Sequence, residues 1–416
     1  MKKILIINAH SSKNKGDAAI IISMIQSIQK FIPNSQIIVS SRYPEDDDLY
    51  REYGSEVVEQ LTRFPNKNHS FLKRLTFLLK ELREVNKFVK KGIIPSTRSS
   101  DIFNYYKEAD IVVSCGGGFL YSHPKYHIEA SLIMHLAQIY FATKLDKEVI
   151  TYSQSIGPFR SSLSKKIANF VLKKVKNITI REDLSRTFLN DIGISNPVIV
   201  GDSAFSMIAD DIETKELIDL DQQKFNVGVT VRQWRFPGHE NVDQLYSNYI
   251  EAVAKSIEHL VNNYNANVYL VPQVTGPTPI EDDRISNSNV WEKLSDGVKG
   301  SVIMLDNDFT PQELKAIYSK FNIFIGTRMH SNIFSLSSHV PTVAIAYEPK
   351  TTGIMKMLSL SDYVLDINEI TTQDMLNTID KCIAEKENYR IDLTNKIPVI
   401  KNEAEKPARM IKSLIS

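Results

Sequence analysis

Short apolar runs rich in β-branched residues alternate with longer amphipathic stretches along the whole 416-residue chain. The runs in the first half are KILIIN (3–8), QIIVSS (36–41), DIVVSC (110–115), EVITYS (148–153) and NITIRE (177–182). Those in the second half are FNVGVTV (225–231), NVYLVPQ (267–273), SVIMLD (301–306), FNIFIG (321–326) and TVAIAY (342–347). Buried strands separated by helical segments such as 17–31 and 126–143 are typical of a parallel sheet covered on both faces. The pattern therefore predicts an α/β fold.

The alternation stops and restarts, which predicts two domains. A chain of this length exceeds what one hydrophobic core usually supports. An acidic stretch without glycine, 206–224, separates the two sets of strands. We therefore expect a Rossmann-like domain over 1–205, a linker over 206–224, a second Rossmann-like domain over 225–395 and a C-terminal helix over 396–416. The two domains are expected to face each other across a cleft.

The formal net charge of +1 hides an asymmetry between the halves. Residues 1–200 carry 29 Lys and Arg against 19 Asp and Glu, a net charge of +10, and residues 201–416 carry the remaining 21 and 30, a net charge of −9. Such a split indicates domains that meet different partners. No nucleic-acid recognition motif accompanies the basic half, so we expect no nucleic-acid partner.

The cellular setting is constrained by what the sequence lacks. No apolar run approaches the roughly 20 residues that a membrane-spanning helix needs. The start, MKKILIINAH, lacks a long apolar region and a cleavage site, so it favours a first strand over a signal peptide. Cys115 and Cys382 match no metal or redox spacing, which favours a reducing cytoplasm.

The segment 70–92 predicts one long amphipathic helix, with Ser70 as its N-cap and Gly92 as its stop. Its apolar stripe is formed by Leu75, Leu79, Leu82, Val85 and Val89, with lysines and arginines around it. One interpretation is a helix packed on its own domain with a solvated basic face. The other is contact with an anionic membrane surface or a lipid-linked substrate.

Ligands of doubly wound sheets bind beyond the carboxyl ends of the strands, where helix N-termini favour anions. The loop 8–20 lies at such a position and contains Asn14, Gly16 and Asp17. It is not the glycine-rich dinucleotide fingerprint. Asp17 is either an ordinary acidic residue of a first helical turn or a group that binds a substrate hydroxyl.

Two further loops of the first half are candidates. Three consecutive glycines follow the strand 110–115, and Gly117 and Gly118 would let the backbone approach a ligand closely. His123 and His127 stand four residues apart, but a metal site needs a third ligand and none is evident, so we predict no metal. Gln154 and Ser155 open a third loop, SQSIGPF.

Cations follow three strands of the acidic second half. The candidate residues of these loops are Arg232, Arg235, Arg328, His330, Tyr347, Glu348 and Lys350. A single surface cation carries little information, but three at one edge of a sheet indicate a small bound polyanion. Arginine suits this task because its planar fork binds carboxylate and phosphate through two hydrogen bonds.

The motifs of the chain together resemble those of the polysaccharide pyruvyl transferase family. They are NKGDAAI near the start, GGGF, QSIGP, REDLSRTFLNDIG (181–193), GDSAF (201–205) and RMHSNIFSLSSHVPTVAIAYEPK (328–350). The resemblance covers most of the chain and implies two domains like those of B-type glycosyltransferases. It implies transfer of the enolpyruvyl carbon skeleton of phosphoenolpyruvate to a sugar as a pyruvate ketal, with release of phosphate and without a cofactor. By position in the family motifs, Arg328, His330 and Arg232 are the residues implicated in the reaction.

The resemblance gives the remaining candidates a role. His330 is expected to supply a proton, Arg328 and Arg232 to hold the anionic groups, and Asp17 to act as the base on the acceptor. Arg181 and Gln273 are further substrate-binding candidates. The implied acceptor is a sugar of a lipid-linked precursor or a polysaccharide, which suits a cytoplasmic protein, peripheral at the inner membrane face.

Two other functions stay open on the sequence. A nucleotide-sugar-dependent glycosyltransferase of the same shape would explain the anion-binding loops, with Glu348 as a ribose ligand. A non-catalytic sugar-binding assembly protein would also keep the fold.

Overall fold

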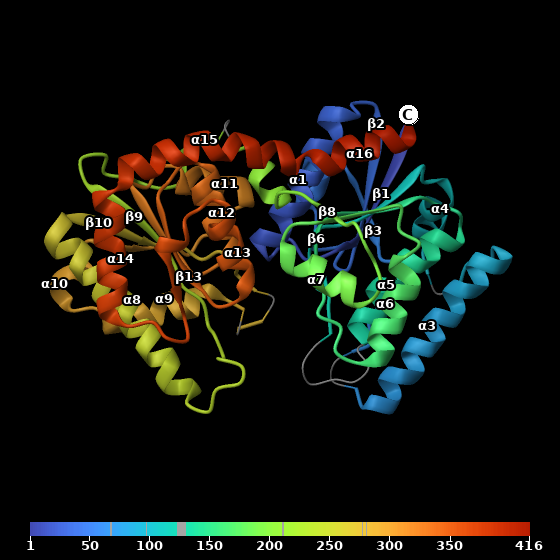
Figure 1. The fold of residues 1–416 in the computed structure, drawn as a ribbon, viewed down its shortest axis with the longest axis horizontal. Coiled ribbons are helices and arrows are strands. Elements are labelled where there is room, and N and C mark those ends of the chain that lie inside the picture. The colour runs from blue at the N-terminus through green and yellow to red at the C-terminus, as the bar shows by residue number, and fades with distance from the viewer. Residues whose placement is uncertain (67–68, 97, 123–129, 210–211, 277, 280) are drawn as a thin grey trace. The chain divides into compact units, whose positions relative to one another are not determined.

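The computed structural model describes the chain except for residues 67–68, 97, 123–129, 210–211, 277 and 280 (Figure 1). The chain divides into two compact units. The first unit consists of Met1–Ser12, Ile20–Met207 and Lys401–Ser416, and the second of Lys13–Ala19 and Ile208–Ile400. Each unit has its own parallel sheet, which confirms the α/β class and its two Rossmann-like parts.

The sheet of the first unit has the strand order β3-β2-β1-β4-β6-β7-β8, with β5 paired to β6. Its strands are β1 (Lys2–Ala9), β2 (Ser35–Ser41), β3 (Glu56–Glu59), β4 (Ile111–Ser114), β5 (Gly117–Leu120), β6 (Val149–Ile156), β7 (Asn177–Ile180) and β8 (Val198–Ile199). Its helices are α1 (Lys15–Phe31), α2 (Leu49–Glu52), α3 (Phe71–Lys91), α4 (Asp101–Glu108), α5 (Ala130–Lys144), α6 (Ser162–Leu172), α7 (Asp183–Asp191), η1 (Ser203–Ser206) and α16 (Lys406–Ile415). Every strand pairing is parallel, so helices must connect the strands, as the alternating sequence pattern predicted.

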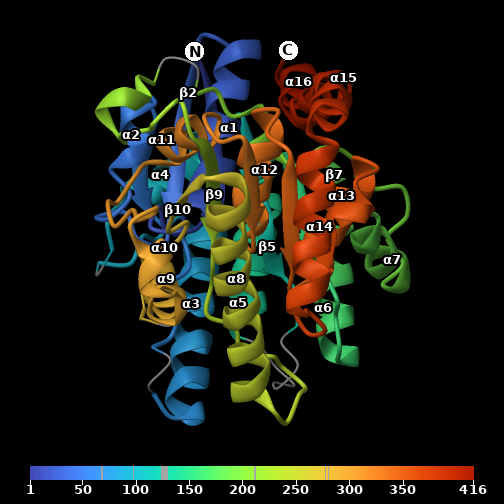
Figure 2. The same ribbon diagram turned by 90° about the vertical axis from the view of Figure 1, so that its left-hand side faces the viewer.

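The sheet of the second unit has the order β11-β10-β9-β12-β13-β14, again with parallel pairings only. Its strands are β9 (Phe225–Thr230), β10 (Ala266–Leu270), β11 (Val302–Met304), β12 (Ile323–Gly326), β13 (Thr342–Ala346) and β14 (Val364–Asp366). Its helices are η2 (Thr214–Glu216), α8 (Val242–Tyr264), α9 (Asp283–Lys293), α10 (Asp296–Lys299), α11 (Pro311–Tyr318), α12 (Met329–Ser337), α13 (Pro349–Met357), η3 (Ser361–Tyr363), α14 (Thr372–Ala384) and α15 (Lys386–Ala404). Helices α8 and α14 pack side by side on one face of this sheet (Figure 2).

All ten predicted strands exist, but four short strands carried too little signal to be recognised. They are β3, β5, β8 and β14. Of these, β5 matters most, because it contains Gly117 and Gly118, which the sequence had placed in a ligand-binding loop. The first of the three glycines, Gly116, is required by packing, because a larger residue would not fit there. A Cβ on Gly116 would lie 2.8 Å from the carbonyl oxygen of Tyr152 and 2.9 Å from Cγ2 of Ile20.

The borders of the units differ from the expected ones at three places. Residues 13–19 belong to the second unit, and residues 208–224 join it as well. Residues 401–416 contain the expected C-terminal helix, α16, but belong to the first unit. The ion pair between Lys15 and Asp308, with 2.9 Å between Nζ and Oδ1, contributes to the first difference. An ion pair of 2.7 Å between Lys30 and Glu405, close to the start of α16, contributes to the third.

The apolar stripe expected for the helix 70–92 is only partly buried. Helix α3 begins after Ser70 and ends at Gly92, whose φ of 69° is the left-handed conformation that favours glycine at a helix end. The side chains that face the core are Leu78, Glu81, Val85 and Phe88. Leu79, expected in the core, is 56% exposed. The helix is thus rotated by roughly a quarter of a turn from the expected orientation, because the long helix carries apolar residues on two faces.

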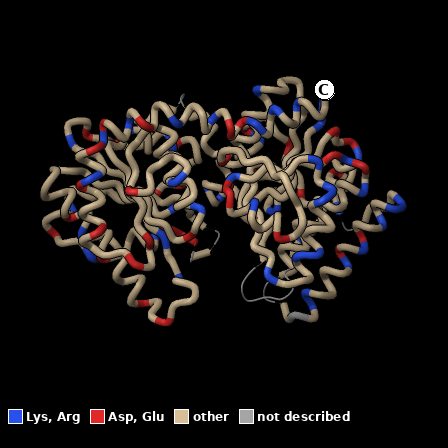
Figure 3. The backbone as a smooth tube through the Cα atoms, in the orientation of Figure 1, with Lys and Arg blue, Asp and Glu red and all other residues tan. Residues whose placement is uncertain are grey.

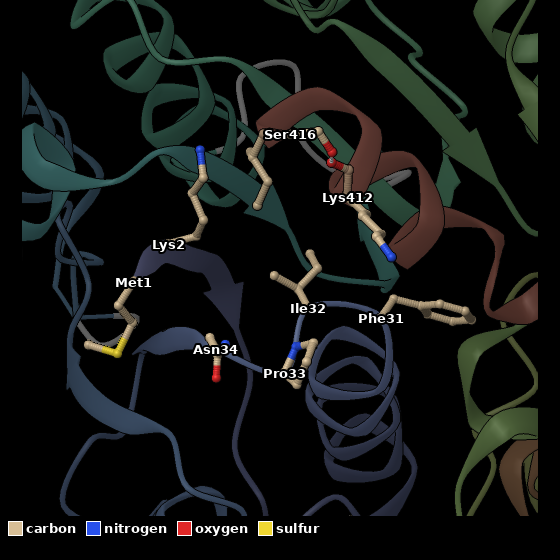
Figure 4. A pocket seen from close by; sticks show the side chains of 9 residues that line it. Met1, Lys2, Phe31, Ile32, Pro33, Asn34, Lys412 and Ser416 are labelled. Carbon is tan, nitrogen blue, oxygen red and sulfur yellow. Dashed lines mark hydrogen bonds between the residues drawn. The ribbon is translucent and has the colours of Figure 1, made fainter.

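A pocket of about 420 Å³ lies in the first unit where the two ends of the chain meet (Figure 4). Its walls include Met1, Lys2, Phe31, Ile32, Lys412 and Ile415. None of the candidate site residues lines it. Among the described residues, no helix combines the length and the apolar character needed to cross a bilayer.

Candidate functional site

The two candidate arginines of the second unit lie at the point where its strand order reverses. Strands β9 and β12 are neighbours, while β10 follows on the far side of β9 and β13 on the far side of β12. Arg232 stands two residues after β9 and Arg328 two residues after β12. The crevice beyond the carboxyl ends of such a pair is where open α/β sheets bind ligands.

Arg328 is held by a carboxylate that the sequence did not single out. Its Nε and Nη2 donate to Oδ1 of Asp283 at 3.1 and 2.5 Å, and Nη2 also donates to the carbonyl of Glu281 at 3.2 Å. The side chain of Asp283 is fully buried, whereas that of Arg328 is 12% exposed. One side of the guanidinium is therefore fixed in place.

Asp283 is itself oriented by the backbone. Its Oδ2 accepts hydrogen bonds from the amides of Gln273 and Val274 at 3.1 and 3.0 Å. Burial raises the pKa of Asp283 above its ordinary value, and the charge of Arg328 opposes this effect. Burial would lower the pKa of Arg328, but the attraction and hydrogen bonds to Asp283, together with the nearby Tyr347 and Tyr249, outweigh it, so this pKa is raised. The pair keeps Arg328 positively charged in a buried position.

Arg232 lies against two aromatic rings. Its guanidinium carbon is 4.0 Å from the ring centroid of Tyr347 and 4.8 Å from that of Trp234. Burial lowers the pKa of Arg232, and the positive charge of Arg328 lowers it further. A bound anion would offset both the burial of Arg232 and the positive charge of Arg328.

Hydroxyl groups brace the two strand ends that carry these arginines. Tyr249 shares a hydrogen bond of 2.8 Å with Thr327 and accepts one of 3.3 Å from the amide of Arg232. Thr230 shares a hydrogen bond of 2.9 Å with Ser331. These buried contacts connect β9 to the start of α12, so they fix the spacing of the two cationic loops.

His330 lies in the first turn of α12 and packs against Gly16. A Cβ built on Gly16 would lie 2.1 Å from Nδ1 and 2.6 Å from Cγ of His330. Both residues belong to the second unit, because the segment 13–19 is part of it. Only glycine leaves room for the imidazole at this place, which gives the N-K-G-D segment a role in positioning His330.

Substituting Gly16 with alanine is expected to displace the imidazole, because the new methyl group needs the same space. If His330 has the role expected from the sequence, turnover should fall by about 100-fold, since misplacing a catalytic group by 1 Å costs about that much. Steady-state kinetics would measure the loss. The matched control is Gly353→Ala, where a Cβ meets nothing within 4 Å and turnover should not change. Wild-type turnover of the Gly16 variant would contradict the placement of His330.

Asn14 and Asp17 form the N-terminal cap of α1. Oδ1 of Asn14 accepts from the amides of Gly16 and Asp17 at 3.1 and 3.4 Å, and its Nδ2 donates to Oδ2 of Asp17 at 2.9 Å. The side chain of Asn14 thereby accepts hydrogen bonds from backbone amides that have no acceptor within the helix. The half-buried Asp17 therefore has a structural task, and its role as a base stays a prediction.

The other candidates of the second unit differ in how far they are buried. Arg235 and Glu348 are exposed, so Arg235 is not part of the buried cluster around Arg328. Lys350 is half-buried in the first turn of α13. Gln273 is buried, and its Oε1 accepts from the hydroxyl of Tyr318 at 2.8 Å.

The candidates of the first unit are mainly inside the structure. Gln154 and Ser155 lie within β6 rather than in a loop beyond it. Arg181 donates from Nε to Oγ of Ser155 at 2.8 Å and from Nη1 to Oδ2 of Asp202 at 2.6 Å. This buried network gives Arg181 and the aspartate of the G-D-S-A-F motif a structural role. This network does not support a contact between Arg181 and a substrate.

A buried polar cluster that the sequence did not reveal lies at the strand reversal of the first sheet, between β1 and β4. Asn8 has a φ of 65°, and its Oδ1 contacts Nδ1 of His135 at 3.0 Å and accepts from Gln138 at 2.6 Å. Ser114 connects this cluster to Gln154. Burial keeps the pKa of His135 well below its ordinary value, so the ring is neutral at physiological pH. Only the fold brings these separate segments together.

The histidines 123 and 127 lie outside the described residues. Within the described part of the chain, no group of three His, Cys, Asp or Glu side chains is placed to hold a metal ion. The absence of a metal from the reaction stays a prediction.

Comparison with solved structures shows the fold. A glycosyltransferase from Rickettsia africae superimposes with a TM-score of 0.59 at 14% identity, covering 100% of this chain and 98% of that one. A UDP-GlcNAc 2-epimerase from Methanocaldococcus jannaschii superimposes with a TM-score of 0.60 at 12% identity, covering 99% and 100%. At these identities the likeness supports the architecture alone.

Comparison of sequences is more informative. The Amylovoran biosynthesis protein AmsJ of Erwinia amylovora is 26% identical over 386 residues, which cover 88% of this chain and 89% of the relative. The family model described as Polysaccharide pyruvyl transferase matches residues 14–349. That range begins at the cap of α1, includes Arg232, Arg328 and His330, and ends in the first turn of α13. The chain therefore belongs to the polysaccharide pyruvyl transferase family.

Proposed function

We propose that the protein transfers the enolpyruvyl carbon skeleton of phosphoenolpyruvate to a sugar of a cell-surface polysaccharide or of its lipid-linked precursor, forming a pyruvate ketal. The family membership supports a transferase role in polysaccharide pyruvylation. The finer assignment depends chiefly on one observation, the placement of Arg232 and Arg328 directly after the neighbouring strands β9 and β12, at the strand reversal of the second sheet.

Phosphoenolpyruvate matches this charge pattern. It carries a carboxylate and a phosphate on a three-carbon alkene, so two separate arginines can each bind one group through paired hydrogen bonds. The N-terminus of α12 adds backbone amides and a positive dipole end. Because Asp283 occupies one side of Arg328, the guanidinium is held in a fixed orientation before the substrate arrives.

The reaction needs one proton donor and one acceptor. Protonation of the terminal methylene carbon creates cationic character at the central carbon, which a sugar hydroxyl attacks. Phosphate then leaves, and a second hydroxyl of the same sugar closes the ketal. Of the two hydroxyl protons, one balances the new methyl group and the other leaves with phosphate. His330 is the proposed donor because it lies two residues from Arg328, in the first turn of α12. Asp17 is the proposed base.

The first unit is the proposed acceptor-binding domain. Its basic charge suits an anionic lipid-linked acceptor. No step of the proposed reaction calls for a cofactor or a nucleic acid, and the proposed location is the cytoplasm.

The rival function, glycosyl transfer from a nucleotide sugar, would use the aromatic rings near Arg232 to stack a base. The rings of Trp234 and Tyr347 are 4.7 Å apart, but Arg232 itself stacks on Tyr347. This contact favours an anion-binding role for the cluster.

The test is a phosphate-release assay with phosphoenolpyruvate and candidate acceptors, followed by mass detection of the product. We expect phosphate release that requires the acceptor, together with a product heavier than the acceptor by one pyruvate ketal. A panel of nucleotide sugars is the parallel arm. Transfer of a sugar from that panel, with no turnover of phosphoenolpyruvate, would overturn the proposal.

A further inference from the structure

Helix α3 of the first unit presents a second apolar stripe that its own unit does not cover. The inward side packs on α5 and α4, with the ring centroids of Phe88 and Phe103 4.7 Å apart. The outward stripe consists of Leu72, Leu75, Leu79 and Leu82, spaced three and four residues apart along one face. Leu72 is 71% and Leu79 56% exposed, and Ile93 beyond the helix is 54% exposed. Leu75 and Leu82 are half-buried at the border of the stripe.

A basic stripe runs beside the exposed leucines. Its exposed members are Lys73, Lys80, Arg83, Lys87, Lys90 and Lys91. Figure 3 shows blue segments of Lys and Arg along α3. Lys73, Lys80 and Lys87 recur every seven residues, so they lie on one side of the helix. The helix carries seven Lys and Arg against two Glu, a net charge of +5.

The two glutamates do little to neutralise this face. Glu81 points inward, where its Oε1 pairs with Nη2 of Arg63 at 2.8 Å and its Oε2 lies 3.4 Å from Nη1 of Arg98. The charge of Glu81 is therefore compensated by two arginines inside the unit and does not neutralise the outward lysines. Glu84 lies 3.9 Å from Nζ of Lys80, a loose surface pair. The outward face keeps its positive charge.

We infer that the outward face of α3, defined by its leucine and lysine stripes, binds the surface of a bilayer containing anionic lipids. An interfacial helix lies in the plane of the headgroups with its apolar face toward the acyl chains and its cations at the phosphates. Lysine suits this position because its aliphatic stem can lie along apolar surface while the ammonium reaches the phosphate layer. The inference stands independently of the proposed reaction.

The chemistry of the stripe favours a bilayer over a protein partner. Protein interfaces obtain most of their affinity from buried aromatic and arginine anchors set in pockets. The described apolar side chains that are exposed here are aliphatic, and the stripe from Leu72 to Leu82 follows the helix axis for about 15 Å at 1.5 Å per residue. A straight aliphatic stripe with parallel cations matches a flat, fluid, anionic surface, which needs no shaped pocket.

The direct test is co-sedimentation of the full chain with vesicles. The compared vesicles are phosphatidylcholine alone and phosphatidylcholine mixed with phosphatidylglycerol. We expect binding to the mixed vesicles only, weakening steeply with added salt, because screening shortens from about 10 Å at 0.1 M to about 3 Å at 1 M. Equal binding to both vesicles, binding indifferent to salt, or no binding would each overturn the inference.

Variants locate the surface on the molecule. The triple substitution Lys73→Glu, Lys87→Glu and Lys90→Glu is expected to weaken binding to the mixed vesicles by at least about 100-fold, since each lysine near an anionic surface contributes about fivefold. The matched control, Lys215→Glu, Lys320→Glu and Lys356→Glu, makes the same change in net charge at exposed sites of the second unit and should change binding much less.

Substitution of the exposed leucines is a second test, and it leaves the net charge of the helix unchanged. Leu72→Ser with Leu79→Ser should weaken binding at least about tenfold, because two exposed apolar side chains no longer insert. The corresponding control is Ile391→Ser with Val399→Ser, which removes equally exposed aliphatic side chains from α15. Phosphate release with a water-soluble acceptor should be the same in all four variants. If α3 instead mediated self-association, the α3 variants would change the oligomeric state and leave vesicle binding intact, and the inference would be wrong.

Discussion

Replacing His330 with alanine is expected to lower turnover by about 10²–10⁴-fold, which is the usual contribution of a positioned general acid or base. Thermal stability should change little, because the ring is only half-buried. The affinity for phosphoenolpyruvate should also be kept, since the arginines that bind it remain. The measurement is the phosphate-release assay, run over a range of pH.

The matched control for this substitution is His239→Ala, which removes an exposed histidine of the same unit. It should retain normal kinetics. A general acid also leaves a signature that a structural residue does not. The His330 variant should lose one limb of the pH profile of kcat, whereas a residue with a purely structural role would lower all rates equally. A full profile at reduced height would argue against proton donation by His330.

Replacing Asp283 with alanine is expected to destabilise the second unit by about 3–5 kcal/mol, because it leaves the guanidinium of Arg328 buried without its counter-charge. The backbone amides of Gln273 and Val274 lose their acceptor at the same time. Phosphate release should fall strongly even at temperatures where the protein stays folded, since Arg328 is no longer oriented. Thermal denaturation followed by circular dichroism measures the first effect and the phosphate-release assay measures the second.

Two further variants separate stability from function. Asp282→Asn changes the neighbouring acid, which caps α9 and pairs with Arg284 at 2.6 Å, and should cost no more than about 2 kcal/mol with turnover kept. The double substitution Asp283→Leu with Arg328→Met removes the buried pair altogether and should recover most of the lost stability without activity. Activity in the double variant would show that Arg328 does not bind substrate.

The sequence predicted the arginines that follow the strands, but not the carboxylate that pairs with one of them. Arg232 and Arg328 could be placed from sequence because each directly follows a buried apolar run, and parallel strands bring their carboxyl ends to one edge. Asp283 could not, because it lies in the acidic run EDDR, where three successive acids have the same local pattern. Which of them turns inward depends on the backbone amides after β10, some ten residues away in sequence.

The same limit explains the errors in the first half. The glycines 117 and 118 indicate a ligand-binding loop by their place after the strand 110–115, yet they form a strand against β6. Arg181, a substrate-binding candidate within a family motif, pairs with Asp202 in the interior, and its contact with substrate stays a prediction. In both cases the contacting residue lies in another segment of the chain, so the local sequence does not predict the contact.

What the sequence by itself determined is therefore the local alternation of strands and helices, the two parallel sheets that follow from it, and the cations at their carboxyl ends. These depend on periodicities that each segment carries alone. The tertiary structure alone decided which charges are compensated, that a glycine from the start of the chain packs on His330, and which face of α3 is left exposed. Those outcomes depend on contacts between segments up to some 300 residues apart, whose free energies no single segment contains.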